Sequence, residues 1–230
     1  MSWDEGHARW WIEEVSTDPS YERDVDPLLE RLVPARGAGL VLDVGCGEGR
    51  SLGRFGRTIG VDLLPSLARL AAVRGPVVVA DAATSLPFAD GGFEGAYAVL
   101  VLEHLADPSR LIAELARVVR PGGWCVVVHN HPALTAPDSG PVVDTSDGEV
   151  LWRWGTYLGS GHTDEPAGTG TVRFHHRTTG ELLSLFAGAG WSLEALAEAP
   201  LGDMDDPLLY AQRFIPRLLG ARWRRLPAAV

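Results

Sequence analysis

Apolar residues along the chain fall into short continuous runs that alternate with amphipathic segments. Five runs rich in Val, Leu or Ile predict strands over residues 39–43, 57–62, 76–80, 93–100 and 123–130. Continuous apolar runs are typical of strands that are buried on both faces of a sheet. Helical spacing over residues 65–73 and 108–119 predicts two of the connecting helices. This alternation predicts a parallel, doubly wound sheet with right-handed crossovers.

The two ends of the chain extend this alternating core, which covers residues 38–130. Helical spacing over residues 7–34, interrupted at Asp18-Pro19, predicts a helical N-terminal cap within residues 1–37. Beyond residue 177, the pattern predicts a helix over 178–189 and strands over 191–198 and 218–223. These segments give a C-terminal helix and strands over residues 178–230, and the whole chain reads as one domain.

Residues 131–177 interrupt the alternation of predicted strands and helices. They are rich in glycine and proline and show little periodicity. A compact domain rarely contains so long an irregular stretch unless the stretch serves as a lid or a binding loop. We therefore predict an irregular insertion here that covers a binding site.

The composition excludes several classes of function. The chain carries 30 acidic and 20 basic residues, a net charge of −10, which argues against sequence-independent binding of nucleic acid. Every basic residue is arginine, so Schiff-base catalysis by lysine and a phosphate-loop hydrolase are excluded. Two cysteines form neither a disulfide framework nor a zinc site, which, without a secretory N-terminal pattern, favours a cytoplasmic protein. The longest apolar run, residues 96–102, is too short to span a bilayer, so no membrane partner is expected.

A glycine-rich turn, VLDVGCGEG over residues 41–49, follows the first predicted strand. Three glycines there allow a tight turn and a close approach of the backbone to a ligand. Their spacing is G-x-G-x-G, and Arg50 stands where the third glycine of a dinucleotide pattern would lie. Asp43 and Glu48 make the turn acidic, which disfavours a phosphate and suits a cationic ligand.

Acidic residues also follow the next two predicted strands. Asp62 ends the second strand, where a carboxylate can accept hydrogen bonds from ribose hydroxyls. Asp81 follows the third strand and can accept a hydrogen bond from an exocyclic amine such as that of adenine. Three adjacent strand ends thus each present an acid, with glycines beside the first, which is a specific signal for a nucleoside-containing ligand.

Four segments, VLDVGCGEG, IGVD, VVVADAATSLPFADGGFEGAYAVLVLEHL and RVVRPGGW, resemble in order and spacing the class I S-adenosylmethionine-dependent methyltransferases of the type 11 kind. The resemblance covers about residues 38–130. It implies a Rossmann-like α/β fold with a seven-stranded, mostly parallel sheet, helices on both faces and an antiparallel last strand. It further implies S-adenosylmethionine as cofactor, S-adenosylhomocysteine as product, and an enzyme that methylates an oxygen or nitrogen of a small molecule.

The resemblance also implies roles for individual residues. Asp62 would bind both ribose hydroxyls, and Leu63 would pack on the adenine. The strand-four end would lie under the sulfonium, and the glycines would line the methionine part. Apart from the resemblance, the aromatic residues Tyr21 and Trp10-Trp11 of the N-terminal cap either cover the cofactor as a lid or pack as parts of amphipathic helices. The expected cofactor-binding residues are Asp43, Gly45, Gly47, Gly49, Asp62, Leu63, Asp81, Ala82, Val99, Leu100 and Tyr21.

Histidines and aromatic residues are the candidates for the acceptor side. His131 is the first candidate for a general base, because it leaves strand five at the expected acceptor edge and Pro132 restricts its backbone. His104, after strand four, is the second candidate, as a base or as a wall of the site, with packing at a helix N-terminus as the alternative. Expected acceptor-binding residues are Trp152, Trp154, Tyr157 and His175, with a purely structural role as the alternative. The histidines lack supporting carboxylate or cysteine spacing, so no metal is expected.

Two further functions stay open at this stage, a nicotinamide-dependent oxidoreductase and a non-catalytic S-adenosylmethionine-binding protein. A nucleic-acid acceptor is not expected, because Val99-Leu100-Val101 lacks the polar groups that hold an amino group for base methylation. The sequence does not indicate an oligomeric state or the identity of the acceptor.

Overall fold

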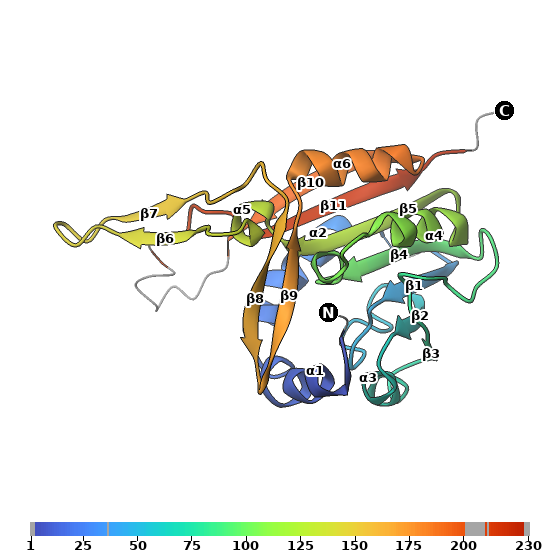
Figure 1. The fold of residues 1–230 in the computed structure, drawn as a ribbon. Helices are drawn as coiled ribbons and strands as arrows, with labels where there is room; N and C mark the ends of the chain where they lie inside the picture. Colours follow the sequence, from blue (N-terminus) through green and yellow to red (C-terminus); the bar gives the residue numbers. More distant parts are fainter. Residues whose placement is uncertain (1–2, 36, 201–209, 211, 228–230) are drawn as a thin grey trace.

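The computed structural model describes residues 3–35, 37–200, 210 and 212–227 (Figure 1). Its centre is a seven-stranded sheet with the strand order β10-β11-β5-β4-β1-β2-β3. The strands are β1 Leu40–Val44, β2 Arg57–Asp62, β3 Val77–Val79, β4 Phe93–Val99, β5 Val119–Asn130, β10 Trp191–Ala199 and β11 Leu218–Arg225. The pairs among β3, β2, β1, β4 and β5 are parallel, whereas β11 is antiparallel to both of its neighbours. The predicted fold class is therefore confirmed.

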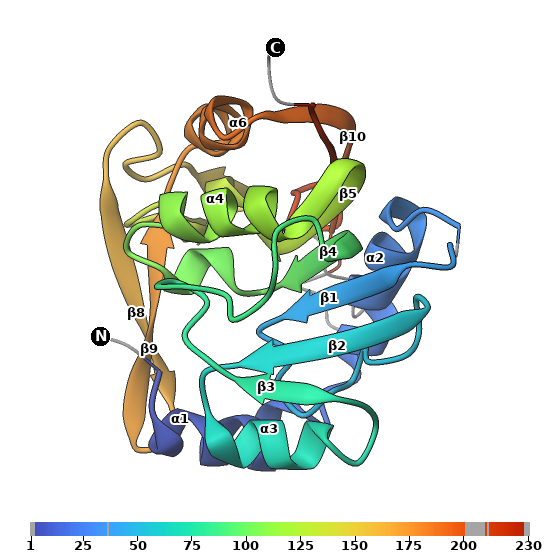
Figure 2. The same ribbon diagram turned by 90° about the vertical axis from the view of Figure 1, so that its right-hand side faces the viewer.

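Helices cover both faces of the sheet (Figure 2). Helices α4 (Ser109–Val118) and α6 (Thr179–Gly188) pack on one face, where Ile112 and Phe186 join Cys125 and Val127 of β5 in a buried cluster. Helix α2 (Asp26–Leu32) packs on the other face against Val126 and its alternating neighbours in β5. Helix α3 (Pro65–Ala71) contacts β2 and β3. Because successive strand residues point to opposite faces, a continuous apolar run such as β5 serves both cores.

The N-terminal segment is helical but broken into short pieces. Helix α1 (Glu5–Trp10) continues into a π-helical turn at Trp11–Val15, and a second π-helical turn, Tyr21–Val25, leads into α2. The Asp4 carboxylate caps α1 by accepting the amide protons of Gly6 and His7. The interruption of the helix that was predicted at Asp18-Pro19 lies between the two π-helical turns.

Residues 131–177 are not irregular, and that expectation is wrong. After the single turn α5 (Pro132–Thr135), β6 (Gly140–Val143) pairs with β7 (Val150–Arg153), and β8 (Gly161–Ala167) pairs with β9 (Gly170–His176). Both pairs are antiparallel hairpins (Figure 1). Strands of four and seven residues that contain Pro141 and Pro166 give no clear alternation in the sequence, because their pairing comes from the cross-strand partner.

Among the described residues, no helix is long and apolar enough to cross a membrane. Cys46 and Cys125 are both buried free thiols.

Candidate cofactor and acceptor site

A cavity of about 470 Å³ lies at the carboxyl ends of β1, β2, β3 and β4. This is the edge where parallel α/β sheets bind ligands, and the volume is within the usual range for a small-molecule site. All the expected cofactor residues except Gly49 line it, namely Asp43, Gly45, Gly47, Asp62, Leu63, Asp81, Ala82, Val99, Leu100 and Tyr21. The topology thus brings together residues from four separate strand ends.

Two glycines of the turn have no room for a side chain. Gly45 has a φ of 67°, and a Cβ there would lie 2.5 Å from Val101 Cγ2. Gly49 has a φ of 82°, and a Cβ there would lie 2.9 Å from the Ala71 backbone. Gly49 is therefore a packing residue between the turn and α3, whereas Gly45 lets the backbone border the cavity.

Asp62 holds the glycine turn against the end of β2. Its Oδ2 accepts the Gly47 amide proton at 2.8 Å, and its Oδ1 accepts the Leu64 amide proton at 2.9 Å. Burial raises the pKa of Asp62, and these two amide donors act in the opposite direction. Each carboxylate oxygen keeps a second lone pair, so Asp62 can still accept hydrogen bonds from a pair of vicinal hydroxyls.

Asp43 is a different kind of acid. It is fully buried, and burial raises its pKa to about 8, against the effect of a hydrogen bond from Tyr97. The Tyr97 hydroxyl lies 3.1 Å from both Asp43 Oδ2 and the Ser51 carbonyl oxygen. The single hydroxyl proton can be donated to only one of these oxygens. If it is donated to the Ser51 carbonyl, a proton on Asp43 allows the carboxyl group to donate to the Tyr97 oxygen in turn. Asp43 therefore supports the base of the turn as a largely neutral group.

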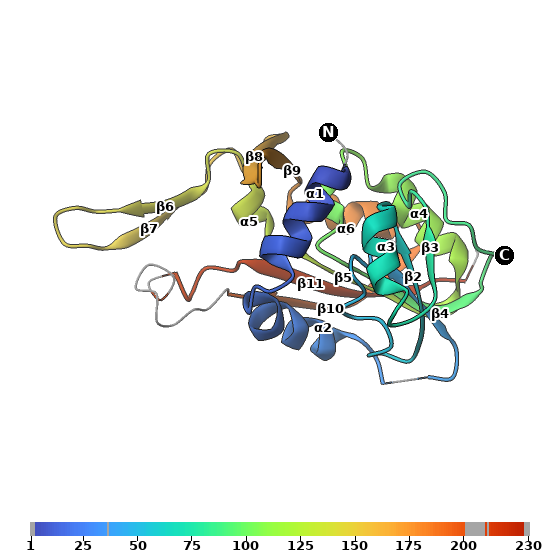
Figure 3. The same cartoon turned by 90° about the horizontal axis from the view of Figure 1, so that it is seen from below.

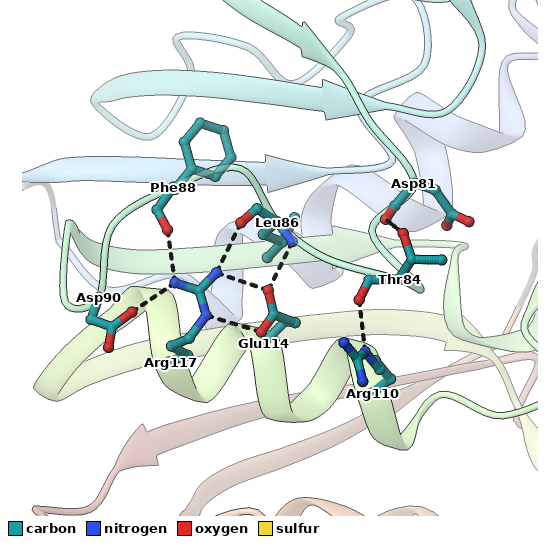
Figure 4. Close-up of polar contacts among 8 residues, drawn as sticks. All are labelled: Asp81, Thr84, Leu86, Phe88, Asp90, Arg110, Glu114 and Arg117. Atoms are coloured by element: carbon teal, nitrogen blue, oxygen red, sulfur yellow. Dashed lines mark hydrogen bonds and ion pairs between the residues drawn. The ribbon is translucent and has the colours of Figure 1, made fainter.

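The loop that carries Asp81 is fixed by two arginines of α4 (Figure 4). Arg117 donates to the carbonyl oxygens of Leu86 and Phe88 at 2.8 and 2.7 Å and pairs with Glu114. Arg110 donates to the Thr84 carbonyl at 2.7 Å. The hydrogen bond from Arg117 lowers the pKa of Glu114 to about 2, so this ion pair persists over a wide pH range. The network holds the loop just beyond the residue expected to meet adenine.

The N-terminal cap forms the wall opposite the sheet. Trp11 Nε1 donates to Glu48 Oε2 at 2.6 Å, which joins the cap to the glycine turn. Arg50 stacks its guanidinium 4.3 Å from the centre of the Tyr21 ring and also donates to the Ser16 carbonyl. Trp11, which was expected either to cover the cofactor or to pack in a helix, lines the cavity, and so do Trp3, Arg50, Leu64, Leu67 and Asp107, for which no role was expected. The sequence features that could have indicated some of these residues are the tryptophan-rich N-terminal segment and the arginine beside the glycine turn.

The end of β4 is strained. Leu100 has a φ of 55°, one of two positive values among the described non-glycine residues, and its amide donates to the Val128 carbonyl at 2.7 Å. A branched residue in the left-handed region costs free energy and persists only where the surroundings enforce it. This conformation brings the Val99–Val101 backbone to the cavity wall. In the family that the sequence resembles, the sulfonium of the cofactor is expected there.

Two histidines border the cavity on the side toward the β8–β9 hairpin. His104, in a short 3₁₀ helix at Leu102–His104, lies 3.1 Å through its Nδ1 from the Arg173 carbonyl. A carbonyl oxygen only accepts, so Nδ1 carries the proton and Nε2 of the neutral ring is left as an acceptor. Its ring is flanked by Trp3 and Phe174, with centroids 5.1 and 5.0 Å away. His175 lines the same cavity, and burial lowers its pKa.

His131 does not lie in this cavity, which corrects its expected place at the acceptor. Its Nδ1 accepts the Ala133 amide proton at 3.0 Å and so caps α5, and its Nε2 lies 2.9 Å from Glu198 Oε1. Both ring nitrogens thus have structural partners. Pro132 does extend the backbone at His131, but it directs the ring to the helix cap instead of the cavity.

Three of the four expected acceptor-binding residues are also placed elsewhere. Trp152 donates to the Ala133 carbonyl at 3.3 Å, and Tyr157 donates to Thr179 Oγ1 at 3.2 Å. Trp154 is 59% exposed and packs edge-on against Tyr157. None of the three lines the cavity. Trp152 lies on the β6–β7 hairpin, which points away from the sheet edge, and Trp154 and Tyr157 lie on the segment that follows it. Only His175 of this set borders it.

Within the part of the chain that the structure describes, no three histidine, cysteine or acidic residues lie close enough to hold a metal ion. The polar groups of the cavity fit a nucleoside with a cationic tail, because the acids lie at adjacent strand ends and the walls are otherwise mostly apolar and aromatic.

Comparisons with known proteins agree with this geometry. Residues 42–127 match the family described as a methyltransferase domain. The structure of an S-adenosylmethionine-dependent methyltransferase from Mesorhizobium loti superposes with a TM-score of 0.75 at 27% identity, over 86% of this chain and 96% of that one. The O-methyltransferase resE of Aspergillus sclerotiorum is 34% identical over 136 residues, half of each chain. The ubiquinone biosynthesis O-methyltransferase of Thiobacillus denitrificans is 34% identical over 130 residues, 50% of this chain and 55% of its own length. The chain thus spans about half the length of these curated relatives.

Proposed function

We propose that this chain, a class I S-adenosylmethionine-dependent methyltransferase, transfers the methyl group to a hydroxyl oxygen of a small molecule. The observation that carries the choice of oxygen is His104. Its Nδ1 is held by the Arg173 carbonyl, so Nε2 is available to accept a proton at the cavity wall. A hydroxyl group becomes a good nucleophile when a base removes its proton, whereas a neutral amine can attack the methyl group without losing a proton first. The O-methyltransferase names of two relatives support the same choice.

On this proposal, each strand end binds a different part of the cofactor. Asp62 accepts the ribose hydroxyls, Asp81 and Ala82 face the adenine amine, and Leu63 packs on the base. The glycine turn and the Val99–Leu100 backbone surround the methionine end, and Tyr21 covers it from the cap. The carboxylates of Asp62 and Asp81 also favour the positive charge that the sulfonium carries. Bound S-adenosylmethionine supplies an activated methyl group, so the protein mainly orients the two reactants and excludes water.

The acceptor then occupies the part of the cavity bordered by Trp3, His104 and His175. Tryptophan and imidazole rings favour a planar, mostly apolar acceptor, because they offer flat apolar faces with few fixed polar groups. We therefore expect a small hydroxylated aromatic compound. His104 would hold the hydroxyl proton while Trp3 packs on the ring.

The test has two stages on the full chain. Calorimetry should detect one site per chain for S-adenosylhomocysteine, and binding of NADH in its place would overturn the methyltransferase assignment. A panel of phenols, alcohols, carboxylic acids and amines is then incubated with S-adenosylmethionine, with formation of S-adenosylhomocysteine and of methylated product as readouts. Turnover of phenols supports the proposal. Turnover confined to amines overturns the choice of oxygen, and cofactor binding without turnover on any acceptor favours a non-catalytic binding protein.

A further inference from the structure

The β6–β7 hairpin projects from the body of the protein as a separate arm (Figures 1 and 3). Its strands pair only with each other, with Val142 opposite Leu151 and Val143 opposite Val150. A two-stranded ribbon without a third layer is marginally stable in water. A projecting ribbon that keeps its strand pairing is therefore more stable with a second surface against it.

The arm is apolar on both faces. Val142, Val143 and Leu151 are 43%, 51% and 51% exposed, and the cross-strand pairs place Val142 and Leu151 on one face and Val143 on the other. Beyond the strand end, Trp154 and Leu158 are 59% and 91% exposed. Contiguous exposed apolar side chains on a ribbon mark a binding surface rather than an ordinary solvated face.

A second apolar patch lies at the same end of the molecule, on the segment that leads into β11 (Figure 1). Phe214 is 83% exposed and Tyr210 is 48% exposed. The Arg213 guanidinium stacks over both rings, 4.0 and 4.4 Å from their centres. Together the arm, the segment that follows it and this patch hold seven of the fourteen exposed large apolar residues in the described part of the chain, namely Val142, Val143, Leu151, Trp154, Leu158, Tyr210 and Phe214.

The charges of the two surfaces are opposite. The turn of the arm carries Asp144, Asp147 and Glu149, which are exposed and have no basic partner among the described residues. The aromatic patch carries Arg213, which stacks on the two rings and donates to the Tyr210 carbonyl at 2.8 Å, and which has no carboxylate partner among the described residues. An acidic tip with apolar flanks thus matches a basic centre with aromatic flanks.

We propose that this arm binds a second copy of the chain, in a twofold dimer in which each arm lies across the Tyr210–Phe214 patch of the other copy. In a twofold interface, residue i meets residue j and j meets i, so a single chain must carry both complementary surfaces. This chain carries both, at one end, outside the cofactor cavity. The two contacts form together, which doubles the apolar area that one arm could cover.

Sedimentation of the full chain tests the proposal. We expect a species of twice the 24.7 kDa chain mass, which dissociates on dilution. Leu151→Glu and Phe214→Glu should each weaken the dimer at least ~10-fold, since each places a charge in an apolar contact. Val73→Glu is the matched control, because Val73 is 88% exposed on the segment after α3, and it should leave the dimer unchanged. All three positions are exposed, so far-ultraviolet circular dichroism at low temperature should show the same folded chain in the three variants.

A charge exchange tests the pairing itself. Glu149→Arg and Arg213→Glu should each weaken the dimer, and the double variant should restore it, because the new charges again attract across the interface. A chain that is monomeric at every concentration overturns the proposal. So does a dimer that is insensitive to both Leu151→Glu and Phe214→Glu. A dimer that depends on Leu151 but not on Phe214 overturns the arm-to-patch geometry and indicates arm-to-arm pairing.

Discussion

The cofactor side and the acceptor side of the cavity differ in how their residues arrive there. On the cofactor side, Asp62 ends β2 and Asp81 lies two residues after β3, and parallel pairing places those strand ends next to one another. On the acceptor side, Trp3, His104 and His175 come from the cap, a 3₁₀ helix and a hairpin strand. The first group is positioned by the sheet and the second by contacts between distant segments. Function on the cofactor side therefore depends on topology, and on the acceptor side it depends on packing.

His104→Asn should have the largest effect, on turnover. The asparagine amide replaces the Nδ1 donor to the Arg173 carbonyl, while the acceptor at Nε2 is lost. Loss of a positioned base lowers the rate ~10²–10⁴-fold. Steady-state rates with the best acceptor should show that fall, with unchanged affinity for S-adenosylhomocysteine. Normal turnover would make His104 a wall residue and would move the acceptor chemistry to His175.

Asp62→Ala should come next and should affect the cofactor side alone. The variant loses the hydrogen bonds to the ribose, which contribute ~1.5–3 kcal/mol each, and it also leaves the Gly47 and Leu64 amides without their acceptor. Calorimetry should show an affinity for S-adenosylhomocysteine at least ~100-fold lower. Asp43→Asn, at the base of the same turn, should change it only a few-fold. Equal losses in the two variants would place the ribose elsewhere.

The pH dependence of stability should distinguish the two acids further. Burial holds the pKa of Asp43 at about 8 in the folded chain, against ~3.9 in an unfolded one. A raised pKa means that the folded state keeps a proton that the unfolded chain releases. The stabilisation is complete below about pH 4 and is lost as the pH rises toward 8. Denaturant titrations from pH 4 to 9 should show a loss in the parent that is smaller in Asp43→Asn, where only Asp62 keeps a raised pKa at this turn. Parallel profiles would show that Asp43 is charged in the folded protein.

Trp11→Phe probes whether the cap belongs to the cofactor side. The substitution keeps an aromatic ring and removes the indole donor to Glu48, a contact that contributes ~1–2 kcal/mol. Calorimetry should show a loss of about 5- to 30-fold in affinity for S-adenosylhomocysteine. Trp10→Phe is the matched control, since Trp10 Nε1 donates to Glu14 of its own segment. Identical behaviour of the two variants would separate the cap from the cofactor.

His131→Ala should have the smallest effect on catalysis. His131 caps α5 and pairs with Glu198, away from the cavity, so its removal costs ~1 kcal/mol of stability, as for other helix caps. Thermal melting should show a small decrease, while turnover and cofactor affinity should match those of the parent. A fall in turnover comparable to that of His104→Asn would mean that the acceptor reaches His131.

By itself, the sequence determined the sheet and the cofactor edge. The strand predicted over residues 57–62 is β2 itself, and the other core strands agree within a few residues, because buried parallel strands are continuous apolar runs whatever they pack against. Asp43, Asp62 and Asp81 could be placed at one edge because strand order and direction alone decide where strand ends meet.

Tertiary structure alone decided the acceptor side. His131 and Trp152 stand near the expected edge in the sequence, yet one caps α5 and the other packs on the Ala133 carbonyl. Trp3, far from any motif, reaches the cavity because α1 is joined to the β8–β9 hairpin through His7 and the Thr171 carbonyl. The direction of a side chain on a short hairpin or cap depends on its distant packing partners. The local sequence pattern does not indicate those partners, so only the folded chain shows which aromatic and imidazole rings line the acceptor side of the cavity.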